Sequence, residues 1–240
     1  IAHWIQELKI YPYTKQHPKG LRYIVMRKSK TTGDILVVLV TTGRGFFYEQ
    51  LAEKIIEAHR SITGVVLHCN NQQGNAIFER DENGLIPSIR LEGKPTIEEE
   101  INGVRYEIGP GDFFQINPYI AERLHADVLK ASEQFSGYPM VDLYCGVGFF
   151  TLGLAKKHGW AYGIEGISSA ISRAKRSADS NELIAEFHSG DVADEMDRLK
   201  RKLGESSPCI VVDPARRGLE EGVVEEILDL NPAGIIYVSC

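Results

Sequence analysis

Apolar and polar residues repeat with different periods along the chain, which predicts its secondary structure. Two apolar stretches, residues 21–28 and 35–40, are separated by a turn-forming segment and predict a β-hairpin. Apolar positions in residues 46–60 follow helical spacing, and the β-branched run 64–69 predicts another strand. These elements predict a small α+β domain over residues 1–95.

From residue 96 onward, apolar strand patterns alternate with helical patterns. Residues 101–108 predict a strand, Pro118 suits a helix start, and residues 119–134 have helical spacing. The βαβα order that follows predicts a parallel sheet with helices on both faces, so we place a second, α/β domain at residues 96–240. Its strands are expected at residues 139–144, 160–165, 184–188, 208–213 and 233–239, and its helices at residues 149–158, 168–181, 193–203 and 219–229.

Polar and small residues follow the predicted strands of the second domain. Ligands of open α/β sheets bind at the carboxyl ends of the strands, which directs attention to the turn Asp142-Leu-Tyr-Cys-Gly-Val-Gly148. Glu165 lies 23 positions after Asp142, near the spacing of a carboxylate that binds ribose hydroxyls. Thr151 stands where a dinucleotide motif has its third glycine, which favours a nucleoside without a pyrophosphate. A tight turn, or a helix N-cap at Glu165 or Asp191, is the alternative interpretation.

Charge and composition exclude fewer functional classes than the residues at the strand ends do. The formal net charge of −6 argues weakly against a nucleic-acid partner, yet residues 1–60 hold ten Lys and Arg against five Asp and Glu. This local excess suits either a solvated face or an RNA backbone. The chain lacks an apolar run of membrane-spanning length and does not begin with a signal-peptide pattern, so we expect no membrane and a cytoplasmic location.

The four cysteines, at positions 69, 145, 209 and 240, show neither a C-x-x-C pair nor metal-ligand spacing. We therefore expect no metal site, no metal cluster and no disulfide framework. A scattered cysteine is usually a small buried apolar residue, and a reactive thiol is less common.

Four segments in order resemble one known family. They are Phe113-Phe-Gln-Ile-Asn117, Asp142-Leu-Tyr-Cys-Gly-Val-Gly148, Asp213-Pro-Ala-Arg216 and Tyr237-Val-Ser-Cys240. The second is similar to the cofactor segment of class I methyltransferases, and the set resembles the RNA (uracil-5-)-methyltransferases, which form 5-methyluridine in rRNA and tRNA. The resemblance implies a Rossmann-like fold, S-adenosyl-L-methionine as cofactor and RNA as substrate. Residues 1–95 more loosely resemble the family's central, RNA-contacting domain.

The resemblance also implies roles for individual residues. Cys240 matches the catalytic nucleophile, while Phe113 and Asp213 match positions near the target uracil. Phe149 departs from the pattern, since relatives can carry a polar Asn there, and no cofactor contact is assigned to it. The positions that match cofactor contacts are Gln115, Tyr144, Gly146, Glu165, Asp191 and Asp213.

Uracil chemistry explains why a thiol would be required. Carbon 5 is a weak nucleophile until a thiolate adds to carbon 6 and converts the ring into an enolate. The target base must also leave its stack, and Phe113 suits stacking on it. Strand alternation would place Phe114 on the opposite face, in the core. The Asp213-Pro-Ala-Arg216 variant favours rRNA over tRNA as the substrate.

Two alternatives stay open: a catalytically inactive RNA-binding module of the same fold, and a methyltransferase acting on a nitrogen. The second is disfavoured because such enzymes normally have an Asp-Pro-Pro-Tyr-like loop that ends in an aromatic residue, whereas this chain has Asp213-Pro-Ala-Arg216. In the family the chain continues beyond the nucleophile with further strands and a glutamate general base, and many members begin with a β-barrel. We therefore expect a fragment with an incomplete sheet edge, weak cofactor binding and no turnover.

Overall fold

The computed structural model describes residues 1–16, 18–82, 85–214 and 218–239. It divides into two compact units: Ile1–Glu99 with Ile108–Gly111, and Glu100–Glu107 with Asp112–Cys240. No helix in the described ranges is long and apolar enough to cross a membrane.

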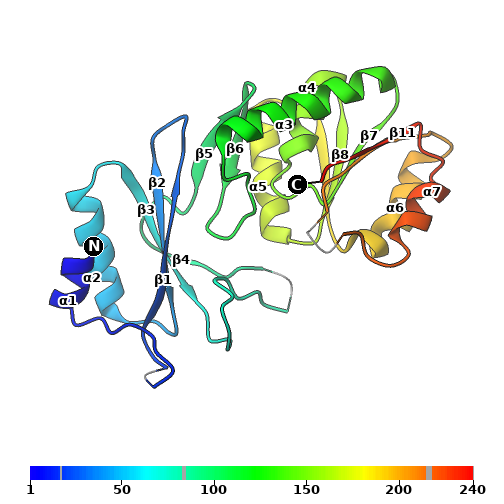
Figure 1. Ribbon diagram of the computed structural model, residues 1–240. Helices are drawn as coiled ribbons and strands as arrows, with labels where there is room; N and C mark the ends of the chain where they lie inside the picture. Colours follow the sequence, from blue (N-terminus) through cyan, green and yellow to red (C-terminus); the bar gives the residue numbers. More distant parts are fainter. Residues whose placement is uncertain (17, 83–84, 215–217, 240) are drawn as a thin grey trace. The chain divides into compact units, whose positions relative to one another are not determined.

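The first unit is built on a four-stranded mixed sheet in the order β1-β2-β3-β4. Strands β2 and β3 are parallel and connected through helix α2, whereas β1 and β4 pair antiparallel at the two edges. Leu51 and Ile55 of α2 pack on Val37 and Val65 of the sheet, and Figure 1 shows α1 and α2 on one face. The elements are α1 Ala2–Glu7, β1 Leu21–Lys28, β2 Ile35–Thr41, α2 Phe46–Ala58, β3 Ile62–Cys69 and β4 Ile89–Gly93.

The start of the second predicted domain holds a hairpin that the sequence pattern did not reveal. Residues 101–108 were expected to form one strand, but Asn102 and Gly103 adopt positive φ angles of 50° and 73° and turn the chain back. Asn-Gly is a strong hairpin signal, and the apolar pattern on either side obscured it here. The strands are β5 Ile97–Ile101 and β6 Val104–Ile108.

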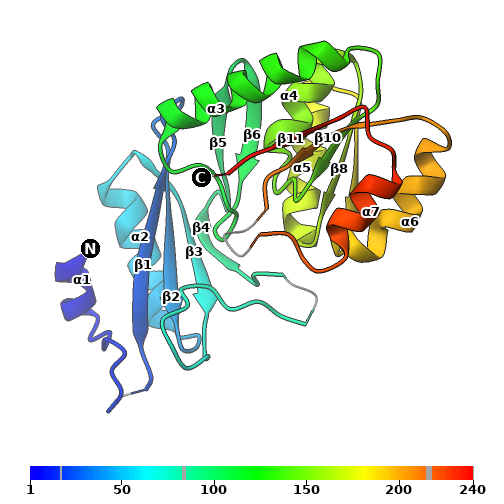
Figure 2. The ribbon, with the colours of Figure 1, turned by 45° about the vertical axis from the view of Figure 1, so that its right-hand side comes forward.

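The second unit has a five-stranded sheet in the order β11-β10-β7-β8-β9, and all its pairings are parallel. This confirms the α/β architecture expected for the unit. Helices α6 and α7 share a core cluster with one face of the sheet, while α4 and α5 pack on the other (Figure 2). The elements are α3 Pro118–Ala131, a 3-10 turn Ser132–Phe135, β7 Met140–Leu143, α4 Phe149–His158, β8 Ala161–Glu165, α5 Ser168–Ser180, β9 Ala185–Ser189, α6 Val192–Leu203, β10 Cys209–Val212, α7 Val223–Asp229 and β11 Gly234–Tyr237.

The strand order places a topological switch at the central strand. After β7 the chain adds β8 and β9 on one side, and then β10 and β11 on the other. Connections on opposite sides of such a strand diverge and leave a crevice at its carboxyl end. The turn after β7 is therefore where a ligand site is expected.

Candidate cofactor and acceptor site

The turn after β7 has an unusual backbone. Tyr144 and Gly146 adopt positive φ angles of 65° and 56°, the first in the left-handed region that a tyrosine rarely occupies. A Cβ added to Gly146 would meet no atom within 4 Å, so the space beside this residue is open. A ligand can therefore approach the backbone closely at this position.

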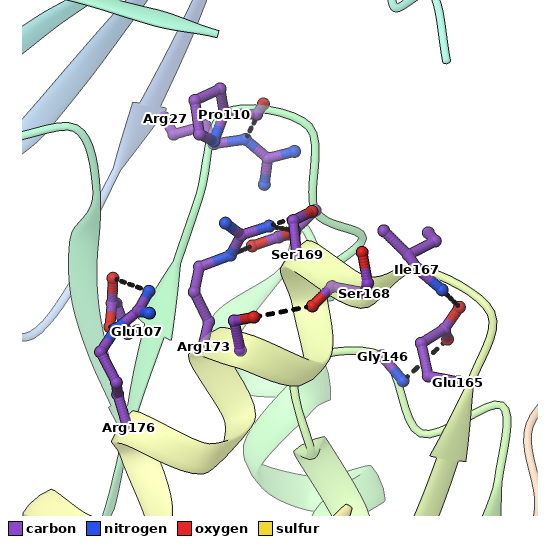
Figure 3. Close-up of polar contacts among 12 residues, drawn as sticks. Arg27, Glu107, Pro110, Gly146, Glu165, Ile167, Ser168, Ser169, Arg173 and Arg176 are labelled. Carbon is purple, nitrogen blue, oxygen red and sulfur yellow. Dashed lines mark hydrogen bonds and ion pairs between the residues drawn. The ribbon is translucent and has the colours of Figure 1, made fainter. Parts of the chain in front are cut away.

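Glu165, at the end of β8, holds this turn from the neighbouring strand. One carboxylate oxygen accepts from the backbone N–H of Gly146 at 3.0 Å, and the other accepts from Ile167 at 2.9 Å (Figure 3). Glu165 is half-buried, and each oxygen can accept a second hydrogen bond. The structure thus brings together two residues that the sequence singled out, Gly146 and Glu165.

Tyr144 is fixed by its hydroxyl, which donates to the Glu220 carboxylate at 3.1 Å. Burial, then the charges of Glu220 and Asp191, raise the pKa of Tyr144 well above its usual range. The ring packs beside the core cluster formed with α6 and α7. Tyr144 therefore stays a neutral, oriented side chain, two residues before Gly146 in the turn.

Asp142 is fully buried in β7 and points to the α4 side of the sheet, since its neighbours Val141 and Leu143 face the opposite cluster. Its Oδ2 accepts from the Thr151 backbone N–H at 2.8 Å and from the Thr151 hydroxyl at 2.6 Å, while Oδ1 has no hydrogen-bond partner among the described residues. Burial raises the pKa of Asp142 to about 7 against the lowering effect of the Thr151 bonds, and the Asp213 and Glu165 charges raise it further.

Asp191 occupies the N-cap of α6, where its side chain accepts from the Ala193 N–H at 3.0 Å. The helix-capping alternative considered from the sequence therefore describes this residue. Asp191 is also exposed, so a capping role leaves its second oxygen accessible to a ligand.

Strands β10 and β11 leave the sheet side by side. Val212 pairs with Tyr237, and the N–H of Val238 donates to the carbonyl of Val212 at 2.9 Å, so Asp213 and Val238 are the next residues of adjacent parallel strands. Asp213 is half-buried, and burial raises its pKa. The predicted nucleophile Cys240 and the end of the predicted loop, residues 215–217, lie outside the described residues.

Residues 113–117 form a loop before α3, not the strand that alternation would have required. The two aromatic residues still differ as predicted, because Phe113 is 71% exposed whereas Phe114 packs on Tyr106 and Phe149 with ring centroids 5.7 and 5.4 Å apart. Gln115 is half-buried. The loop thus presents Phe113 to solvent and anchors itself through Phe114.

Phe149 belongs to a buried aromatic cluster that the sequence did not reveal. The Tyr106 hydroxyl donates to the Phe149 carbonyl at 2.9 Å and lies 3.0 Å from His125 Nε2. Because the hydroxyl proton is used, Nε2 must carry a proton and donate, which leaves Nδ1 to accept from Asn102 Nδ2 at 3.1 Å. Burial lowers the pKa of His125 to about 4, so the ring is neutral at physiological pH. An apolar residue at position 149 is thereby explained by packing.

Known proteins share this fold. Residues 134–207 match a family described as a methyltransferase domain. Over its whole length, the chain superposes with a TM-score of 0.78 and 28% identity on 55% of Pyrococcus abyssi tRNA (uracil-54, C5)-methyltransferase, solved in complex with S-adenosyl-L-homocysteine. The fold is that of class I S-adenosylmethionine-dependent methyltransferases. The predicted fold class is confirmed.

The curated relatives are named as RNA methyltransferases. An uncharacterized RNA methyltransferase of Listeria monocytogenes is 35% identical over 95% of this chain and 49% of its own length. Another from Clostridium acetobutylicum is 35% identical over 100% of this chain and 51% of its own length. The chain therefore spans about half the length of these relatives.

The residues at the switch point fit S-adenosylmethionine. Open space beside Gly146, a carboxylate at the end of β8 and a neutral tyrosine ring match an adenosine with two ribose hydroxyls. Within the described ranges, no group of three or more His, Cys, Asp or Glu side chains is arranged to hold a metal ion.

Proposed function

We propose that this chain is the methyltransferase part of an enzyme that transfers a methyl group from S-adenosylmethionine to carbon 5 of uracil in RNA. The observation that carries the proposal is the pairing of Val238 with Val212. It sends the segments that begin at Asp213 and Ser239 out of adjacent strands, at the carboxyl ends of the strands, where the Gly146 turn also lies. A base-binding carboxyl and a nucleophilic thiol would then both face the cofactor.

In this proposal Glu165 binds the ribose, and Tyr144 and Gly146 line the adenosine. Gln115, Asp191 and Asp213 supply further polar contacts to the cofactor. The cofactor would supply an electrophilic methyl group on a sulfonium. The support comes from the contacts of Glu165 with the turn and from the open space at Gly146.

The chemistry assigned to Cys240 balances as follows. The thiolate adds to carbon 6 of the uracil, the resulting enolate attacks the methyl group through carbon 5, and the sulfonium becomes a neutral thioether. A base then removes the proton from carbon 5, and the electron pair expels the thiolate and restores the ring. A free thiol is only a few per cent ionised at pH 7, so the site must favour the thiolate.

Phe113 is proposed to stack on the uracil after the base leaves its helix. Its side chain is 71% exposed, which leaves the ring accessible to a base. Asp213, with a raised pKa, can donate a hydrogen bond to the uracil when protonated or accept one when ionised.

Ribosomal RNA remains our preferred substrate because of the Asp213-Pro-Ala-Arg216 variant, although the solved neighbour acts on a tRNA. Mass spectrometry of nucleosides from separately purified rRNA and tRNA of a deletion strain would decide between them. Loss of 5-methyluridine from rRNA is expected. Loss from tRNA alone would contradict the rRNA assignment and leave the chemistry intact.

A covalent trap tests the nucleophile in the complete protein that carries this chain. RNA containing 5-fluorouridine should form a stable adduct, because a base cannot remove fluorine from carbon 5 as a cation. We expect Cys240→Ala to abolish both the adduct and methyl transfer, whereas the control Cys69→Ala, a half-buried cysteine of the first unit, keeps both. Methyl transfer that survives in Cys240→Ala would refute the mechanism. RNA binding without any transfer would favour the inactive-module alternative.

A further inference from the structure

An ion pair anchors the start of the loop that carries Phe113 and Gln115. Both carboxylate oxygens of Asp112 accept from the Nε and Nη2 groups of Arg173 in α5. Their side chains are only 2% and 13% exposed. Arg173 Nη2 also donates to Ser169 Oγ at 3.0 Å, so a third residue orients the guanidinium (Figure 3).

A buried pair of this kind is weak evidence for stability, because desolvation offsets much of the attraction. What such a pair does supply is a defined geometry, because two parallel hydrogen bonds fix the angle and the distance between a planar guanidinium and a planar carboxylate. The pair therefore defines where the backbone stands at Asp112, one residue before Phe113.

The same helix is attached to the cofactor turn at its N-terminus. Glu165 accepts from the N–H groups of Gly146 and Ile167, and α5 begins at the next residue, Ser168. A continuous series of hydrogen bonds and helix thus connects the Gly146 turn with Asp112 (Figure 3). Helix α5 therefore fixes the position of the Gly146 turn relative to that of Asp112.

A second ion pair on α5 provides a matched control. One turn after Arg173, the guanidinium of Arg176 donates to both oxygens of Glu107 in β6 at 2.7 and 2.9 Å. This pair has the same geometry but is more exposed, at 55% and 21%, and it holds β6 rather than the loop.

We propose that Arg173 is a positioning residue of the methyl-transfer site, which sets the 113–117 loop, and with it Gln115, against the cofactor through Asp112. The inference rests on the proposed function, because it takes Gln115 as a cofactor contact. Lysine cannot reproduce the fork of an arginine, so Arg173→Lys keeps the charge and removes the orientation.

The test combines hydrogen exchange with binding of S-adenosyl-L-homocysteine by the 240-residue chain. In Arg173→Lys, we expect peptides covering residues 112–117 to exchange faster, and the Kd of S-adenosyl-L-homocysteine to rise about tenfold or more. Arg176→Lys should leave both unchanged within about twofold. Faster exchange confined to α5, or a loosened loop with an unchanged Kd, would overturn the proposal.

A milder variant covers the case in which Arg173→Lys does not fold. Ser169→Ala removes one hydrogen bond of the guanidinium and leaves the ion pair in place. Faster exchange of residues 112–117 with a Kd raised about twofold or more is expected, and unchanged values would contradict the inference. Methyl transfer that survives in Cys240→Ala, in the covalent-trap experiment above, would instead identify the proposed function as the error.

Discussion

Asp142 in β7 accepts two hydrogen bonds from Thr151 in α4, one from its backbone N–H and one from its hydroxyl. The carboxylate thereby accepts from a backbone N–H in the first turn of α4. The N-cap residue Gly148 has no side chain that could accept from this N–H. These two hydrogen bonds connect β7 with α4 across the turn at the proposed cofactor position. Thr151 is thus the partner that fixes the turn.

Removing the Thr151 hydroxyl should destabilise the fold. Thr151→Val keeps the shape but takes a donor from a buried carboxylate, so we expect the free energy of unfolding to fall by about 1–3 kcal/mol. Thr151→Ser retains the hydroxyl and serves as the control. Urea denaturation of the three proteins measures the difference, and equal stability of the Val and Ser variants would show that the bond contributes little.

The pKa of Asp142 predicts a pH dependence. Since it is raised to about 7 in the folded protein, the folded state binds more protons than the unfolded chain from about pH 4 to about pH 7. The contribution of Asp142 to stability is then fully present below this window and is lost as the pH rises through it. Relative to Asp142→Asn, wild-type stability should decline by an amount of the order of 4 kcal/mol.

Denaturant titrations of wild type and Asp142→Asn at several pH values measure that difference, which removes the contributions of the other titrating groups. A constant difference between about pH 4 and pH 7 would mean that Asp142 ionises at its ordinary pKa, and that burial does not govern it.

Gly153 allows α4 to approach α3. A Cβ at this position would lie 2.3 Å from Nε2 of His125, whose ring is fixed by Tyr106. Gly153→Ala should therefore destabilise the protein by about 1–3 kcal/mol, although alanine alone favours helices. In the double variant with His125→Ala the clash disappears, and thermal denaturation should show less than additive destabilisation. Strict additivity would refute the steric explanation.

Glu165 is expected to govern cofactor binding. Glu165→Gln replaces one acceptor oxygen by a donor, which conflicts with an N–H of Gly146 or Ile167, and it removes the charge to which a ribose hydroxyl would donate. The Kd of S-adenosyl-L-homocysteine should rise about tenfold or more, the cost of losing a hydrogen bond to a charged group. Calorimetry measures it, with the exposed Glu205→Gln as control. An unchanged Kd would remove Glu165 from the site.

Phe113 and Phe114 should separate function from stability. Phe113→Ala, at an exposed side chain, should change the free energy of unfolding by less than about 0.5 kcal/mol while it weakens methyl transfer. Phe114→Ala removes contacts with Tyr106 and Phe149 and should cost about 1–3 kcal/mol. Melting temperatures and methylation assays distinguish them. Full activity of folded Phe113→Ala would contradict the stacking role.

The amino-acid sequence by itself determined most of the elements. Strands β7 to β11 and helices α4 to α6 lie within about two residues of their predicted positions, because short apolar runs and helical spacing are local signals. Strands β4 and β5 were missed, since β4 lies in a turn-rich stretch and β5 was not separated from the strand predicted over residues 101–108, which contains β6. Helix α7 begins at Val223, four residues later than expected.

Only the tertiary structure decided which polar groups meet. The Arg173–Asp112 pair joins residues 61 positions apart, and Tyr106 meets His125 across 19 positions. The sequence identified Thr151 only as a residue in place of a glycine, and it indicated no partner for Thr151 or for Asp112. A local pattern records which residues are buried, whereas the partner of a buried polar group depends on how distant elements pack. The local sequence pattern thus predicts where the strands end, whereas the packing of α4 and α5 determines which polar groups meet at the candidate site.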